Sequence, residues 1–83
     1  MGKLGRSQQQ SEMLRTFGVN LRKLRSKRGL RQKDVYDVTG IRMDSLSNYE
    51  RGITNPHMRN VVKLAEFYQV KVDKLFKGAA WGD

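Results

Sequence analysis

Cysteine is absent from this chain of 83 residues, and proline, histidine and tryptophan each occur only once. Without cysteine there is no disulfide, and one histidine cannot build the clustered ligand set that zinc requires. No nucleophile and base occur at a recognisable catalytic spacing. We therefore expect no enzyme activity, no metal site and no cofactor. The lack of cysteine fits a reducing compartment such as the cytoplasm.

Long apolar runs are also missing from the sequence. No stretch approaches the ~18 consecutive apolar residues that a membrane-spanning helix needs. The first ten residues, MGKLGRSQQQ, are polar and do not resemble a signal peptide. The length leaves room for one small domain with a modest core, and dimerisation often helps a domain of this size. We expect a protein without a membrane segment.

Acidic residues are few, and the charge is unevenly distributed. The sequence holds 17 Lys and Arg against 8 Asp and Glu, which gives a net charge of +9. Residues 1–33 contain 10 of the basic residues and one acid, Glu12, whereas residues 34–83 contain 7 of each kind. The excess charge therefore lies entirely in the first 33 residues and favours a polyanion as partner. Charge alone leaves three alternatives open: nucleic acid, an anionic membrane surface and a merely solvated basic face.

Apolar residues at helical spacing predict a first helix that ends near Arg28. The stripe that it would bury is formed by Leu14, Phe17, Leu21 and Leu24. Gly18 interrupts this stripe at a cost of ~1 kcal/mol, which suggests that another helix packs close to it. Ser7 and Ser11 both offer capping chemistry, so the start of the helix is open, and residues 1–10 are interpreted as a flexible arm.

Four shorter helices are predicted downstream, over residues 32–39, 43–49, 58–68 and 73–76. Gly40 would form the turn between the first two, and Pro56 marks a boundary before the third. The residues of the third that are expected to face the core are Met58, Val61, Val62, Leu64, Ala65 and Tyr68. Residues 78–83, which include Trp81, are interpreted as a loose tail. The predicted architecture is all-α, a compact five-helix domain over residues 11–77.

Residues 32–52 predict two short helices that cross steeply at a tight turn, the arrangement that places a helix in the DNA major groove. Gly40 suits the turn because a residue after a helix end often needs a positive φ. Ile41 and Leu46 would fill the angle between the two helices. The outer side of the second helix would carry chemically varied side chains suited to base recognition, namely Met43, Asp44, Ser47, Asn48 and Arg51.

Four segments carry a family resemblance in order and spacing: FGVNLRKLRSKRGLRQKDV, TGI, SLSNYERGITNP and KLAEFYQVKVDKLF. Over about residues 16–77 the chain resembles the phage repressor and Cro-like helix-turn-helix family, also called Xre-like. The resemblance implies a repressor-like fold and a sequence-specific double-stranded DNA-binding transcription regulator. It further implies a repressor that acts as a homodimer, cytoplasmic and nucleoid-associated, and encoded by a bacterium or a phage.

The resemblance also assigns roles to particular positions. The positions implied to face bases are Met43, Asp44, Ser47 and Asn48. The positions implied to contact the DNA backbone are Gln32, Arg42, Arg51, Thr54 and Asn55. Arg25 and Glu50 match a pair that in similar proteins forms a largely buried ion pair between the first and third helices. Charge and position add Arg31 and Arg22 to the predicted phosphate contacts.

The sequence departs from the family pattern at three positions. Tyr36 stands where the family prefers alanine, at the contact between the second and third helices. A tyrosine there must either swing outward or open that contact. Arg31 and Arg42 replace small hydroxyl residues that often cap the second and third helices. We expect both caps to be lost and two cations to be gained near the phosphates.

Alternatives stay open for single residues and for the function. Asn48 could pair with adenine N6 and N7 or be a solvated helix residue, and we favour the base contact. Asp44 could accept from cytosine N4 or be an acid favoured by the helix dipole. Met43 could touch a thymine methyl group or cover the turn. Antitoxins that resemble this family hold a toxin and bind their own operator, and this alternative function would add a protein partner.

Overall fold

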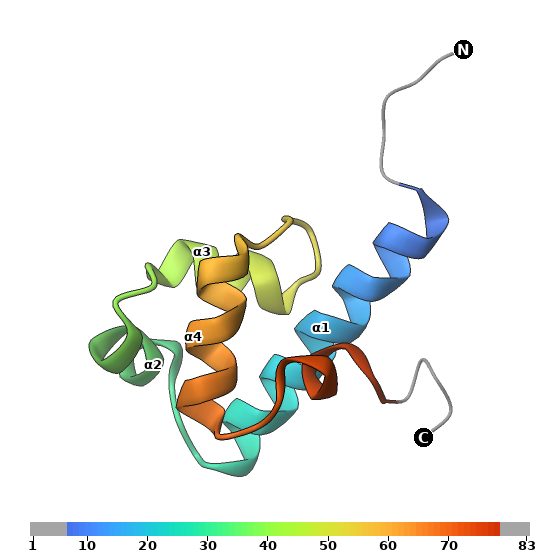
Figure 1. The fold of residues 1–83 in the computed structure, drawn as a ribbon. Coiled ribbons are helices and arrows are strands. Elements are labelled where there is room, and N and C mark those ends of the chain that lie inside the picture. The colour runs from blue at the N-terminus through green and yellow to red at the C-terminus, as the bar shows by residue number, and fades with distance from the viewer. Residues whose placement is uncertain (1–6, 79–83) are drawn as a thin grey trace.

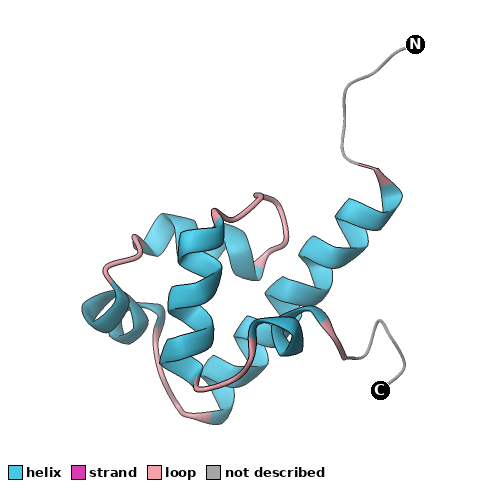
Figure 2. Cartoon of the chain, viewed as in Figure 1, coloured by secondary structure: helices cyan, strands magenta, loops and turns pink. Residues whose placement is uncertain are grey.

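Four α-helices and one 3₁₀ helix make up the computed structural model over residues 7–78, the residues that it describes. They are α1 (Gln8–Lys27), α2 (Gln32–Thr39), α3 (Met43–Glu50), α4 (Met58–Tyr68) and η1 (Val72–Phe76). Figure 2 shows these helices joined by loops, and the described range contains no strand. The all-α class is confirmed, although the fifth predicted helix is a 3₁₀ helix rather than an α-helix.

The long helix α1 supports the other elements (Figure 1). Both α3 and η1 pack on α1, while α2 packs on α3 and α4, and α4 packs on η1. As a result α2 and α3 lie together on one side of the molecule, and η1 covers a different part of α1. None of the described helices is long and apolar enough to cross a membrane.

Helix α1 begins earlier than the predicted domain boundary. Ser7 is its N-cap, and the hydroxyl oxygen accepts a hydrogen bond from the backbone N–H of Gln10 at 3.0 Å. Of the two serines that could cap the helix, the structure uses the first, so residues 8–10 are helical and not part of an arm. The predicted arm over residues 1–6, and residues 79–83 with Trp81, lie outside the described residues.

The core is built around Phe17 of α1, whose side chain is fully buried. Its ring stacks on Phe76 of η1 with centroids 4.9 Å apart and contacts Tyr49 of α3 at 6.0 Å. Leu14 and Leu21 are buried as the apolar stripe predicted, and Leu24 is partly buried against the same cluster. The Phe17 ring thus joins α1 to both α3 and η1.

The inward face of α4 is narrower than predicted. Its buried residues are Val61, Leu64, Ala65 and Tyr68. Met58 is 65% exposed and Val62 is 38% exposed, so the prediction that both face inward is wrong. Each helical residue turns by about 100°, so a stripe fixed by residues 61, 64, 65 and 68 leaves position 62 on its flank. Position 58 opens the helix at the edge of the domain.

Gly18 lies where α1 and α3 approach each other. A Cβ atom at this position would stand 2.5 Å from the carbonyl oxygen of Tyr49 and 2.7 Å from that of Glu50. Both distances are far shorter than a normal contact, so only glycine fits without moving a helix. The close helix approach that the glycine suggested is therefore present, and it places the end of α3 directly on α1.

Candidate nucleic-acid interface

The turn between α2 and α3 is built on Gly40. This residue has φ 77°, in the left-handed region, and its N–H donates to the carbonyl of Tyr36 at 2.8 Å. Thr39 adds a support that we did not predict: its hydroxyl donates to the carbonyl of Val35 at 2.8 Å and accepts from the N–H of Ile41 at 3.1 Å. The turn is consequently short and fixed by hydrogen bonds on both sides.

The four predicted base-facing residues occupy one outer side of α3. Met43 and Asp44 are exposed, while Ser47 and Asn48 are half-buried. On the opposite side Leu46 and Tyr49 are buried against the core. Among the described residues, the hydrogen bonds of α3 do not occupy the Ser47 hydroxyl or the Asn48 amide, so both groups are available to a ligand.

A buried ion pair fixes the C-terminal end of α3. Arg25 of α1 donates from Nε to one carboxylate oxygen of Glu50 at 2.7 Å and from Nη2 to the other at 2.9 Å. The two side chains are only 17% and 8% exposed. The hydrogen bond to Glu50 raises the pKa of Arg25 against the opposing effect of burial. The resemblance implied this pairing between the first and third helices.

Two further contacts extend this ion pair into a small network. The third guanidinium nitrogen of Arg25, Nη1, donates to the carbonyl of Leu30 at 2.9 Å. Nε2 of Gln32, the first residue of α2, donates to Glu50 at 3.2 Å. Glu50 therefore ties α1, α2 and α3 together. In this structure the amide of Gln32 bonds to α3, and its contact with a phosphate stays a prediction.

Arg31 makes no side-chain cap at the N-terminus of α2, as expected, but a different contact supports this end of the helix. The backbone N–H of Arg31 donates to the carboxylate of Asp34 at 2.7 Å, and the Arg31 guanidinium pairs with the same carboxylate at 3.1 Å. A guanidinium has no acceptor, so only this half of a capping box exists. The Arg31 side chain is the main cause of the lowered pKa of Asp34, and its backbone N–H adds to it. The acid three residues after Arg31 was a sequence signal for this contact that we missed.

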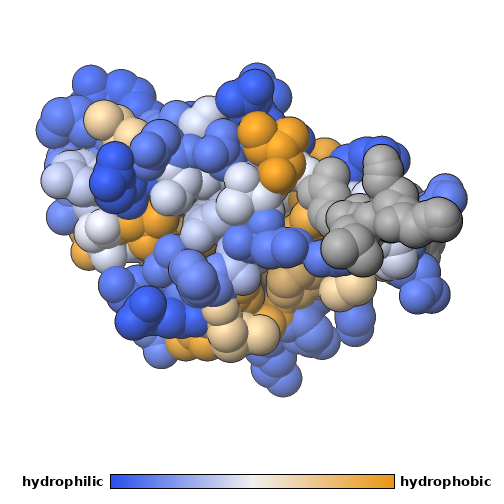
Figure 3. Space-filling model, turned by 90° about the horizontal axis from the view of Figure 1, so that it is seen from above, coloured by the Kyte–Doolittle hydropathy of each residue, from blue (hydrophilic) through white to orange (hydrophobic). Residues whose placement is uncertain are grey.

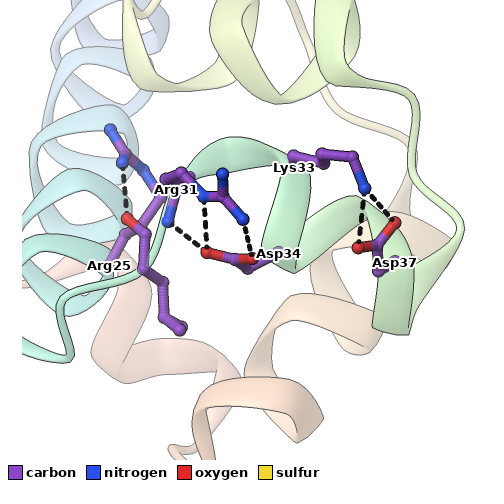
Figure 4. A network of polar contacts seen from close by, with 6 residues as sticks. Arg25, Arg31, Lys33, Asp34 and Asp37 are labelled. Atoms are coloured by element: carbon purple, nitrogen blue, oxygen red, sulfur yellow. Dashed lines mark hydrogen bonds and ion pairs between the residues drawn. The ribbon is translucent and has the colours of Figure 1, made fainter.

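Exposed ion pairs continue along α2 and onto the start of α3. Figure 4 shows Arg31 beside Asp34 and, one turn further along α2, Lys33 beside Asp37, the latter pair at 3.1 Å. At the start of α3, Arg42 pairs with Asp44 at 3.2 Å, with side chains 79% and 66% exposed. Arg42 makes no side-chain cap, as expected. Arg31 and Arg42 thus each pair with an acid in the first turn of the helix that follows them.

The loop between α3 and α4 carries the other predicted backbone contacts. Arg51, Thr54 and Asn55 are all exposed. Asn55 accepts a hydrogen bond through Oδ1 from the side-chain amide of Gln10 on α1 at 3.0 Å. The sequence separation of 45 residues hid this contact from sequence reasoning. The start of α1 therefore contacts the loop that follows α3.

Two other predicted positions, Tyr36 and Arg22, are both exposed. Tyr36 is 41% exposed while α2 and α3 stay packed, so its ring swings outward and the helix contact does not open. Arg22 is exposed on α1, and no described hydrogen bond or ion pair joins it to α2, α3 or the loop. Figure 3, which views the molecule from above, shows a mostly hydrophilic surface with a few hydrophobic side chains between.

The arrangement offers hydrogen-bonding side chains on one helix, cations around it and a rigid support. Within residues 7–78 no group of three His, Asp or Glu side chains could hold a metal ion. The chemistry of the face suits a polyanion with base edges to recognise, which is duplex DNA.

Comparison with known proteins gives matches over the same part of the chain. A family model described as helix-turn-helix matches residues 21–75. The HTH-type transcriptional regulator DdrOP3 of Deinococcus deserti is 42% identical over 64 residues, covering 76% of this chain and 50% of that protein. The cryptic phage CTXphi transcriptional repressor RstR of Vibrio cholerae is 36% identical over 59 residues, covering 71% and 53%.

A solved structure is similar as well. The restriction-modification controller protein C.AhdI of Aeromonas hydrophila superimposes with a TM-score of 0.71 at 33% sequence identity. The match covers 76% of this chain and 96% of that chain. The chain spans about half the length of the curated relatives described above.

Proposed function

The chain belongs to the helix-turn-helix family, and from this premise we propose that it is a sequence-specific, double-stranded DNA-binding repressor of transcription. The observation that carries the proposal is the rigid placement of α3. The Arg25–Glu50 ion pair and the Gly40 turn fix this helix while its outer side stays open to solvent. The names of the relatives, a transcriptional regulator and a transcriptional repressor, agree with it.

In this proposal α3 enters the major groove and its outer residues contact base edges. Asn48 offers a donor and an acceptor that match adenine N6 and N7, and Ser47 offers a hydroxyl. Met43 is exposed at the start of α3 and can meet a thymine methyl group. The base-facing set is Met43, Asp44, Ser47 and Asn48.

The DNA backbone would be held from the two sides of α3. Arg31 and Gln32 begin α2, and Arg42 precedes α3, where the positive end of the helix dipole also favours phosphate. Arg51, Thr54 and Asn55 lie in the loop that follows α3. These contacts would supply affinity and register, whereas the bases supply the choice of sequence.

A homodimer completes the proposal. One short helix spans only a few base pairs, and two copies related by a two-fold axis double the length of the site. Half-sites would then lie about 34 Å apart, one turn of the duplex. The mass of the free protein and of its DNA complex, measured by analytical ultracentrifugation, tests this assembly. A single copy on each bound duplex would contradict it.

Selection of bound sequences from random duplex DNA tests the function itself. We expect a recurring site with two-fold symmetry, bound much more tightly than a scrambled duplex of the same length and composition. Binding to both duplexes should weaken as salt rises, because phosphate contacts release counterions. Equal affinity for the selected and scrambled duplexes would refute sequence-specific recognition, and a flat salt response would refute the phosphate contacts.

Two variants test the division of roles. Asn48→Ala should cost ~1–3 kcal/mol on the selected site and relax the preference at one base pair. Arg31→Ala should instead weaken binding to every duplex about equally and reduce the salt slope by ~1. If the two variants behave alike in affinity, salt dependence and selected sequence, the assignment of α3 to bases and of Arg31 to phosphate is wrong.

A further inference from the structure

Asp44 is an acid in the middle of a face that must approach a polyanion. It stands on the outer side of α3, next to Met43 and on the same side as Ser47 and Asn48. A carboxylate there is repelled by the phosphates of any duplex that α3 enters. It brings no stability through a buried contact, because its side chain is 66% exposed. The helix dipole favours an acid in this first turn, and a base contact in the bound state is a second reason for a carboxylate at this position.

In the free protein two groups hold this carboxylate. One oxygen accepts from the backbone N–H of Ser45 at 2.8 Å, and the other pairs with the guanidinium of Arg42 at 3.2 Å. Arg42 is 79% exposed, and pairs this accessible to water are weak. A DNA phosphate can therefore take Arg42 away from Asp44 easily, and the carboxylate then loses its counter-charge at the moment of binding.

We propose that Asp44 is a specificity-determining residue that rejects DNA in which no cytosine places its N4 amino group within reach of this carboxylate. This rests on the proposed function. On a matching site the exocyclic N4 amino group of cytosine donates to Asp44 and replaces Arg42, which moves to a phosphate. On a sequence that places no amino group there, the carboxylate keeps only the Ser45 N–H and lies among phosphates without a counter-charge. The repulsion therefore weakens binding to the wrong sequences, as discrimination against a competing site requires.

Asp34 provides a contrast within the same molecule. It also pairs with an arginine, Arg31, and it also accepts from a backbone N–H. However, it lies at the start of α2, outside the base-facing side of α3. Its charge should weaken binding to all duplexes by a similar factor, because no base amino group can compensate it.

Three substitutions with the same change of charge test the inference: Asp44→Asn, Asp34→Asn and Asp73→Asn. Asp73 pairs with Lys77 at 3.3 Å and belongs to η1, which lies away from α3 in Figure 1. It therefore reports the effect of one added net charge without a change at the face. Affinities of the full chain are measured for the selected site and for its scrambled duplex at several salt concentrations.

For Asp44→Asn we expect the scrambled duplex to bind more tightly while the selected site does not, so that their ratio falls about tenfold. For Asp34→Asn both affinities should rise together, with a ratio constant within about twofold. For Asp73→Asn both should change less than about twofold. Because an amide can itself recognise adenine, Asp44→Ala is examined in parallel, and its selected sites should lose the preference for cytosine at one position only.

Several results would overturn the inference. A ratio unchanged in both Asp44 variants would show that the carboxylate does not discriminate, and an Asp44→Asn effect equal to that of Asp73→Asn would reduce it to net charge. Selected sites that keep every preference in Asp44→Ala would exclude the base contact. If the wild-type chain itself does not distinguish selected from scrambled DNA, the proposed function fails first, and this outcome is visible before any variant is made.

Discussion

Replacing Gly18 by alanine should destabilise the protein, although alanine is the better helix former. The change adds one methyl group in the middle of α1. Helix propensity alone predicts a gain of ~1 kcal/mol from it. In the structure, however, the new Cβ would stand 2.5 Å from the carbonyl oxygen of Tyr49 and 2.7 Å from that of Glu50. The two effects have opposite signs, so the sign of the measured change decides between them.

The steric cost of the added methyl group should exceed the gain in helix propensity. Overpacking of a tight contact costs ~1–3 kcal/mol, and the upper part of this range applies because both obstructing atoms are backbone atoms that no side-chain rotation can move. Subtracting the propensity gain of ~1 kcal/mol leaves a net loss of ~2 kcal/mol. For a domain of this size that corresponds to a fall in Tm of about 8–16 °C.

Urea unfolding followed by circular dichroism at 222 nm measures this loss directly. Ser26→Ala, at an exposed position of the same helix, is the control for helix propensity alone and should change the free energy of unfolding by less than ~0.5 kcal/mol. A Gly18→Ala protein as stable as the wild type, or more so, would show that α1 and α3 do not approach as closely as described. Because α3 must move to admit the methyl group, the variant should also lose affinity for the selected DNA site.

Three other perturbations probe the support of α3 and the core. Removing either partner of the Arg25–Glu50 pair should cost ~3–5 kcal/mol in urea unfolding, and removing both should cost less than the sum of the two single losses, since neither charge is then left alone. Gly40→Val should lower the free energy of unfolding more than Gly40→Asn, because a φ of 77° disfavours branched residues while asparagine tolerates it. No atom lies within 4 Å of the new Cβ, so a steric clash does not contribute to the difference. Burial raises the pKa of Tyr68 from 10.0 to about 12, so the stability it contributes is complete below pH 10 and disappears as pH rises through about 12. Measured across this pH range, the free energy of unfolding should fall less in Tyr68→Phe than in the wild type. Parallel curves of unfolding free energy against pH for the two proteins would refute the assignment.

Backbone requirements were the most predictable part of the fold. Gly40 marked the turn because few residues accept its φ, and Gly18 marked a helix contact because a glycine inside an apolar stripe is otherwise costly. Both inferences use properties of a single residue, so the sequence carries them directly. The outer side of α3 followed in the same way from helical periodicity.

Contacts between distant residues were not predictable in this way. Asn20 of α1 donates from Nδ2 to the carbonyl of Leu75 at 2.9 Å and so holds η1, but the two residues are 55 positions apart. The Gln10–Asn55 bond has the same character. The prediction that Met58 and Val62 face the core was wrong for another reason, because a hydrophobic residue was assumed to be buried. A hydrophobic residue on the flank of a stripe can stay exposed at little cost.

Ion pairs join the basic residues 1–33 to residues 34–83, which carry no net charge. Three cations from residues 1–33 are paired with acids from residues 34–50, and the pairs are Arg25–Glu50, Arg31–Asp34 and Lys33–Asp37. Counting lysines and arginines therefore overstates the charge that can meet phosphates without first giving up a partner. The buried pair will stay closed, since opening it strands a charge in the core. The exposed pairs can exchange a carboxylate for a phosphate at small cost, but each released acid then repels the DNA. The salt dependence of DNA binding should consequently be shallower than a net charge of +9 suggests.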